Sequence, residues 1–194
     1  MNSERRRVLE SFGNAPARLD AVLRQFPRRM WLYKKSSDCL SIHETVWLLA
    51  DSEVVEYVHC RRFVAEPGSP ALGIDLSDWP ASLGYFHQDT KQALGIIRAL
   101  RRGTYHFLVK LPETAWSRTV DLPTHGRLSL NEWLEIREAC LPEHIQQMVR
   151  TYSEWFNAAS AAKSVRSTLK TWSAGRSNGD MECCGRRVGA PENR

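Results

Sequence analysis

A cysteine and a histidine stand four residues apart in the stretch EACLPEHIQQM, as Cys140 and His144. Residues at this spacing share one face of a helix, and metal sites can take two ligands from a single helix in this way. Pro142 lies between them and can turn the two side chains apart, because proline removes a helical hydrogen bond and bends the helix. The alternative is that Cys140 is a small core thiol and His144 a hydrogen-bonded histidine.

The composition indicates a folded protein. Hydrophobic residues make up 42% of the 194 residues and include seven Trp, which excludes a wholly disordered chain. No apolar run approaches the roughly 20 residues needed to cross a bilayer. The first ten residues, MNSERRRVLE, lack the apolar segment of a secretory signal. We therefore expect a cytoplasmic protein without a membrane partner.

The positive charge lies mostly at one end of the chain. The net charge is +5, and the segment from Lys163 onward has seven Lys or Arg and three acidic residues, which gives +4. The rest is nearly neutral, so we do not expect a nucleic-acid partner. The five cysteines are odd in number and contain no CxxC pair, which argues against structural disulfides and a cysteine-rich zinc module. No role is assigned to Cys183 and Cys184.

Hydrophobic periodicity predicts four helices and no strand of any length. Ser41 with Glu44, and Ser129 with Glu132, have the spacing of a capping box at a helix start. The helices are expected over 16–34, from Ser41 to just before Pro67, over 81–111 and from Ser129 to about 156. We expect Pro27 to bend the first helix and Pro142 to kink the last.

This pattern predicts an all-α four-helix bundle with a disordered C-terminal tail. We divide the chain into an N-terminal extension (1–15), the bundle (16–158) and a basic, Ser/Gly-rich, largely disordered tail (159–194). Trp residues are expected as packing anchors rather than ligands. His43 is expected to be exposed in the first turn of its helix, His106 to lie on a helix flank and His125 in a loop.

Two long stretches carry a resemblance to a known family. LSIHETVWLLADSE, followed by RRFVAEPGSPALGIDLSDW, resembles the DinB/YfiT-like superfamily, whose usual pattern is W-S-x-x-E-x-x-x-H-L-A-D-S-E before an Arg-rich continuation and a Pro-containing loop. LPETAWSRTVDLPTHGRLSLNEWLEI is similar to that family's approach to its last helix. The similarity runs in order from about Leu23 to Met148.

The resemblance implies a four-helix bundle that carries a divalent metal on three histidines. One family histidine lies in the second helix and two lie four residues apart in the last. Many members are thought to act on thiol cofactors or as hydrolases. At these three positions the present chain has Leu48, Cys140 and His144. Leucine cannot bind a metal, so the triad is degenerate.

Neighbouring residues do not restore the triad on helical geometry. His43 is rotated by about 140° from Leu48, and His59 lies about 16 Å further along the axis. Glu44 and Asp51 could replace a ligand only if the site had shifted. His87 is a candidate metal ligand by its residue type alone.

The sequence thus predicts a non-catalytic or small-ligand-binding bundle. Its expected cofactor is none or a weakly bound divalent metal (Zn, Ni or Fe) on His144 and Cys140. The alternative is a metal-dependent thiol transferase or hydrolase with an altered site. A small-molecule or thiol ligand in the bundle cavity and a homodimer are the expected partners.

Overall fold

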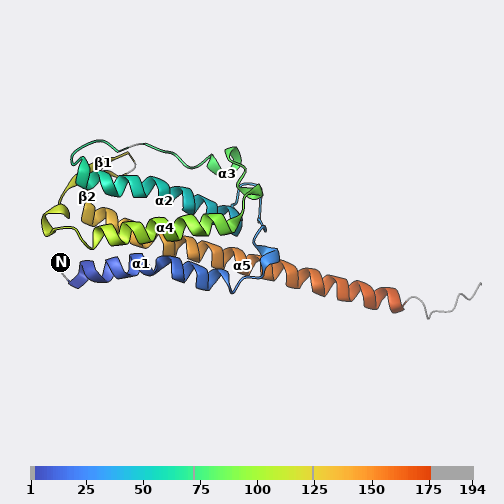
Figure 1. Ribbon diagram of the computed structural model, residues 1–194. Coiled ribbons are helices and arrows are strands. Elements are labelled where there is room, and N and C mark those ends of the chain that lie inside the picture. The colour runs from blue at the N-terminus through green and yellow to red at the C-terminus, as the bar shows by residue number, and fades with distance from the viewer. Residues whose placement is uncertain (1–2, 72, 124, 176–194) are drawn as a thin grey trace, which may run out of the picture. The chain divides into compact units, whose positions relative to one another are not determined.

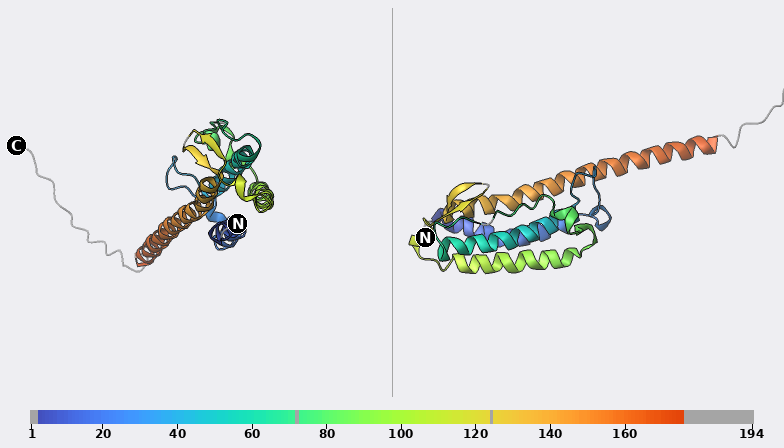
Figure 2. Two further views of the ribbon diagram at one scale, coloured as in Figure 1. Left: turned by 90° about the vertical axis from the view of Figure 1, so that its left-hand side faces the viewer. Right: turned by 90° about the horizontal axis from the view of Figure 1, so that it is seen from above.

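A computed structural model describes residues 3–71, 73–123 and 125–175. The chain forms two compact units, 1–155 and 156–194. In the first unit four helices lie side by side (Figures 1 and 2), which confirms the predicted four-helix bundle. They are α1 (Ser3–Leu23), α2 (Ile42–Ala65), α4 (Thr90–Leu108) and the part of α5 (Leu130–Gly175) that belongs to this unit.

Helix α1 begins earlier and ends earlier than predicted. Its Leu9, Phe12 and Ala15 are buried, although they precede Pro16, where the sequence pattern placed the helix start. These three residues recur at helical spacing and bury one face, so helix formation extends back through the segment assigned to an extension. After Leu23 the chain turns, and a short 3-10 helix η1 (Arg28–Met30) follows Pro27.

Helix α2 is bounded as the sequence predicts. The Ser41 side chain accepts the Glu44 backbone N–H, and the Glu44 carboxylate accepts the Ser41 backbone N–H. The predicted capping box is therefore confirmed. The helix ends at Ala65, two residues before Pro67.

The predicted third helix is broken in two places. Helix α3 (Trp79–Ser82) and the 3-10 helix η2 (Tyr85–His87) precede α4. Gly84 lies between them with φ +59°, a left-handed conformation that ends a helix. Asp89 then accepts the Lys91 backbone N–H and caps α4. The prediction of one helix over 81–111 was wrong because these local breakers outweigh the apolar periodicity.

A β-hairpin replaces the irregular connection expected before the last helix. Strands β1 (Thr119–Leu122) and β2 (Gly126–Ser129) pair antiparallel, and Thr119 faces Ser129 across the hairpin. The segment after α2 adds to it, since the backbone N–H of Gly68 donates to Thr119 and that of Ala71 to Asp121. The absence of strands was thus predicted wrongly.

Helix α5 starts with the second predicted capping box. Ser129 and Glu132 exchange the expected hydrogen bonds. The helix is continuous through Pro142 and extends to Gly175, so residues 159–175 of the predicted tail are helical. Residues 176–194, with Cys183 and Cys184, lie outside the described residues. None of the described helices is both long and apolar enough to cross a membrane.

Two apolar clusters form the core of the bundle. We call the first the upper cluster; it contains Leu19, Val46, Ile97, Leu141 and Met148 among others. The second, the lower cluster, packs against the hairpin and includes Phe12, Phe63, Leu108, Val120 and Trp133. Trp47, Trp116 and Trp133 are buried, which confirms their predicted packing role.

Candidate functional site

Three buried charged residues separate the two apolar clusters. Glu53 on α2, Arg101 on α4 and Arg137 on α5 each stand between members of the upper and the lower cluster along their helices. Their exposed fractions are 4%, 1% and 8%. We call these residues the charged layer. Burying charges is costly unless they are paired, so their partners decide whether the layer is stable.

One carboxylate joins three helices. Glu53 Oε1 accepts hydrogen bonds from Arg101 Nε at 2.8 Å and from Arg137 Nη2 at 3.2 Å. The guanidinium carbon of Arg101 lies 4.1 Å from the centroid of the Phe12 ring on α1, a cation–π contact. The charged layer therefore connects all four helices of the bundle.

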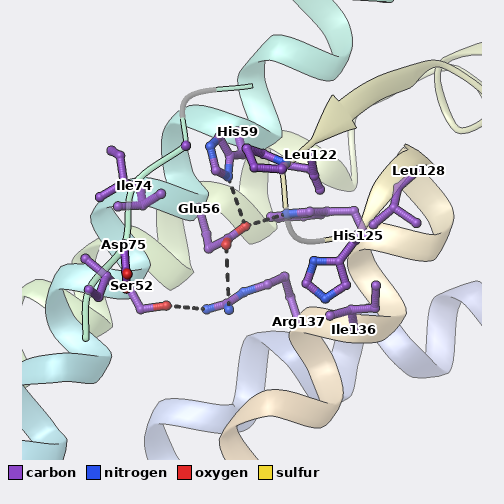
Figure 3. A pocket seen from close by; sticks show the side chains of 15 residues that line it. Ser52, Glu56, His59, Ile74, Asp75, Leu122, His125, Leu128, Ile136 and Arg137 are labelled. Carbon is purple, nitrogen blue, oxygen red and sulfur yellow. Dashed lines mark hydrogen bonds and ion pairs between the residues drawn. The ribbon is translucent and has the colours of Figure 1, made fainter. Parts of the chain in front are cut away.

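A cavity of about 530 Å³ lies beside this layer, within the size range of small-molecule sites. Its walls come from α2, α5, the segment 73–76 and the hairpin (Figure 3). Figure 3 shows Ile74 and Asp75 on one side, and His125 and Leu128 on the other. Most of the wall is apolar and is formed by Val55, Ile74, Leu76, Leu122, Pro123, Leu128 and Ile136.

The polar part of the wall centres on Glu56. Its Oε2 accepts the Trp133 Nε1–H at 2.7 Å and lies 3.6 Å from His59 Nδ1. Its Oε1 lies 3.8 Å from Arg137 Nη1. Figure 3 shows Glu56 between His59 and Arg137, with Ser52 beside the guanidinium. These contacts fix the carboxylate and hold the cavity floor in one arrangement.

The surroundings of Glu56 favour its charged form. Desolvation is the largest influence on the carboxyl group and raises its pKa. The nearby His59 imidazole, the charge of Arg137 and the Trp133 N–H act in the opposite direction, and the resulting pKa lies below the ordinary value. Glu56 is therefore a carboxylate at neutral pH.

The predicted ligands Cys140 and His144 lie on α5, and both are half-buried. Cys140 Sγ is 3.7 Å from Arg137 Nη1 and accepts its N–H. His144 Nδ1 is buried and has no hydrogen-bond partner in the part of the chain that the structure describes. Burial lowers the pKa of His144, and this outweighs the opposing contact with Gln147. The imidazole is thus held in its neutral form.

The residues at the positions that the resemblance assigns to metal ligands do not fit a divalent ion. Leu48 is half-buried against the upper cluster and offers no donor atom. The Arg137 guanidinium next to Cys140 adds a positive charge where a cation would have to bind. Among the described residues, no group of three His, Cys, Asp or Glu side chains could hold a metal. The assignment of His144 and Cys140 as ligands stays a prediction.

The other histidines occupy different surroundings. His43 is buried, not exposed as predicted; its Nε2 lies 2.7 Å from the Tyr85 carbonyl and its Nδ1 2.5 Å from Thr90 Oγ1. This packing explains the difference, because η2 and α4 cover the first turn of α2. His59 and His125 line the cavity, His125 in the turn region where a loop histidine was predicted.

Sequence reasoning missed the charged layer and its cavity. One available signal was a charge at a core-facing position: Arg137 follows Trp133 by four residues and precedes Leu141 by four. All three therefore share one face of α5. The cavity wall from 73–76 and the hairpin had no comparable signal, since it depends on how distant segments pair.

Comparison with solved structures gives a clear fold relative. YfiT from Bacillus subtilis, described as a probable metal-dependent hydrolase with an unusual four-helix bundle topology, matches with a TM-score of 0.73. The identity is 16%, and the match covers 80% of this chain and 90% of that chain. The resemblance read from the sequence is thus confirmed at the level of the fold. No family model matches the chain, and no curated protein sequence does.

Proposed function

We propose that this bundle binds a small organic molecule in the cavity beside the charged layer and needs no metal to do so. The observation that carries the proposal is the cavity itself, a largely apolar pocket of about 530 Å³ with a fixed polar floor. Ligand sites typically combine apolar walls with a few oriented polar groups. Here Glu56 and Ser52 supply those groups, and Arg137 holds both in place.

The charged layer gives the cavity floor its rigidity. Arg137 Nη2 contacts both Glu53 at 3.2 Å and Ser52 Oγ at 3.3 Å. Because Glu53 is anchored by Arg101 on α4, the guanidinium cannot move without breaking contacts between helices. A preorganised floor reduces the entropic cost of binding.

The proposal is tested by filling the cavity. Val55 lines it, whereas the adjacent Val54 is exposed to 47% and does not. Ligand-detected NMR with a panel of neutral and charged aromatic fragments should show binders to the wild type and to Val54→Trp. The same fragments should be lost with Val55→Trp, and with Ile136→Trp on the opposite helix. Binding that survives both fillings, or the absence of any binder, would overturn the proposal.

A second candidate function is a metal-dependent hydrolase or thiol transferase that uses His144, Cys140 and a third ligand. The buried Nδ1 of His144, which has no partner among the described residues, favours it, as does the description of YfiT as a probable metal-dependent hydrolase. Metal analysis of the purified protein under reducing conditions separates the two functions. Stoichiometric zinc, nickel or iron that is lost in His144→Ala would favour the enzyme.

Three further expectations stay proposals: a cytoplasmic location, a homodimer and a thiol as the ligand. Sedimentation of the purified chain tests the dimer. Addition of a low-molecular-weight thiol to the fragment panel tests the ligand. Neither result bears on the cavity assignment.

A further inference from the structure

The charges around the cavity do not balance, and the imbalance points to the kind of molecule it takes. Five titratable residues line the wall: two carboxylates, one guanidinium and two imidazoles, namely Glu56, Asp75, Arg137, His59 and His125. Counted without the two imidazoles, the lining carries one negative charge more than positive. The ion pair behind it, Glu53 with Arg101, is itself neutral.

The guanidinium is not available to an anionic ligand. Arg137 Nη2 is used by Ser52 and Glu53, and its Nη1 faces Cys140 and Glu56. Its Nε is buried and, within the described residues, has no partner. An anion that paired with the two terminal nitrogens of Arg137 would have to displace contacts that join α5 to α2. The guanidinium that lines the described part of the cavity therefore belongs to the protein's own network.

The remaining carboxylate stands at the cavity's edge. Asp75 lies in the exposed stretch 73–75, on the side opposite His125 (Figure 3). Its Oδ1 accepts the backbone N–H of Ser77 at 2.9 Å, which lowers the pKa of the carboxyl group and keeps it charged. No ion pair of Asp75 occurs within the described part of the chain.

We infer that the ligand is a small monocation, an organic ammonium with an apolar body. The apolar body lies against Val55, Leu128 and Ile136, and the ammonium group lies at the edge beside Asp75. The inference rests on the proposed function, since it names the ligand class of that same cavity. Attraction between the ammonium and Asp75 favours this ligand, and repulsion from Asp75 and Glu56 disfavours an anion of the same shape.

Three probes of nearly equal shape test the inference: 2-phenylethylamine, 2-phenylethanol and phenylacetate. Isothermal titration at about pH 8, where imidazoles are mostly neutral, should give the amine the highest affinity. We expect it to bind about tenfold more tightly than phenylacetate, with the alcohol between them. In Asp75→Asn the amine should lose most of this preference, whereas binding of the alcohol should be unchanged.

Asp78→Asn is the matched control, because it removes the same charge three residues away at a position that does not line the cavity. Asp78→Asn should leave the order of the three affinities and the ratios between them unchanged. Equal affinities, or strongest binding of phenylacetate or the alcohol, would overturn the inference and leave the proposed function standing. No binding of any probe at millimolar concentration would overturn both. A preference for the amine that survives Asp75→Asn would also contradict the inference.

Discussion

The upper cluster and the charged layer are neighbours along the bundle, and they join the helices by different interactions. At the level of Leu48 the bundle is apolar, and the histidine position of the resemblance has become part of the packing. About one and a half turns further along α2, Glu53 joins α2, α4 and α5 through two guanidinium groups. A metal ion can cross-link helices. In this chain an ion-pair network does so; its Arg137 guanidinium contacts Cys140, and the cavity lies beside the network.

The largest effect is expected from Glu53→Gln. It removes the charge that compensates two buried guanidinium groups, and uncompensated buried charges typically cost about 3–5 kcal/mol. Urea unfolding followed by circular dichroism should show a loss of this size. Asp121→Asn, which affects the exposed pair with Arg127, should cost less than about 1 kcal/mol. Equal losses in the two variants would show that the charged layer is no more important than a surface pair.

A metal site could be rebuilt in the upper cluster. Leu48→His together with Cys140→His places three histidines at the positions that the resemblance assigns to metal ligands. The Arg137 guanidinium lies beside position 140, but three imidazole ligands should outweigh its repulsion. We therefore expect the double variant to bind zinc, and to be stabilised by about 2.7 kcal/mol when free zinc is 100 times its Kd. Metal analysis measures the bound zinc, and thermal unfolding measures the stabilisation. The same variant with His144→Ala is the control and should bind far more weakly; if the double variant takes up no zinc, the three positions do not converge.

Glu56→Gln should weaken the protein in a pH-dependent way. The folded-state pKa of Glu56 is lowered from 4.5, so its contribution to stability is present above about pH 4.5 and is lost as the pH falls through the lower folded-state pKa. Near neutral pH we expect a loss of about 1–2 kcal/mol relative to the wild type. Urea unfolding at a series of pH values should show that the free energies of unfolding of the two proteins become equal in acid. A stability difference that stays constant or grows as the pH falls would contradict a charged, stabilising Glu56.

The smallest losses of stability are expected when the two capping boxes are removed. Ser41 is fully buried, and its partner Glu44 also pairs with Lys34 at 2.8 Å. Ser129 and Glu132 form the same box in a more exposed setting. We expect Ser41→Ala to cost about 1–2 kcal/mol and Ser129→Ala about 0.5–1 kcal/mol. A reversed order in denaturant unfolding would show that burial does not strengthen the cap.

Local sequence signals predicted the parts of the fold that depend on local interactions. The starts of α2 and α5 follow from Ser41 and Ser129 because a capping box is complete within four residues. The hairpin was missed although Val120 and Leu122 alternate with polar residues in β1. Strands of four residues carry too short a pattern, and pairing with the distant segment 68–71 leaves no local trace.

The candidate site was predicted one level away from where the cavity lies. Cys140 and His144 were predicted as the site because thiol and imidazole groups can bind a metal. Arg137, three residues before Cys140, lies at a core-facing position of the helix pattern, but the sequence does not show that Glu53 compensates its charge. A charged side chain becomes a core residue only through tertiary pairing, which a single sequence does not display.

The most direct test of the cavity assignment is a titration of the nitrogen-15-labelled protein with 2-phenylethanol, observed at the indole N–H resonances. The Trp133 N–H donates to Glu56 on the cavity wall, whereas Trp116 is buried elsewhere in the lower cluster. Trp133→Phe and Trp116→Phe assign the two resonances. We expect a saturable shift of the Trp133 resonance with no change at Trp116. An unchanged Trp133 resonance, while another tryptophan shifts or none does, would contradict it.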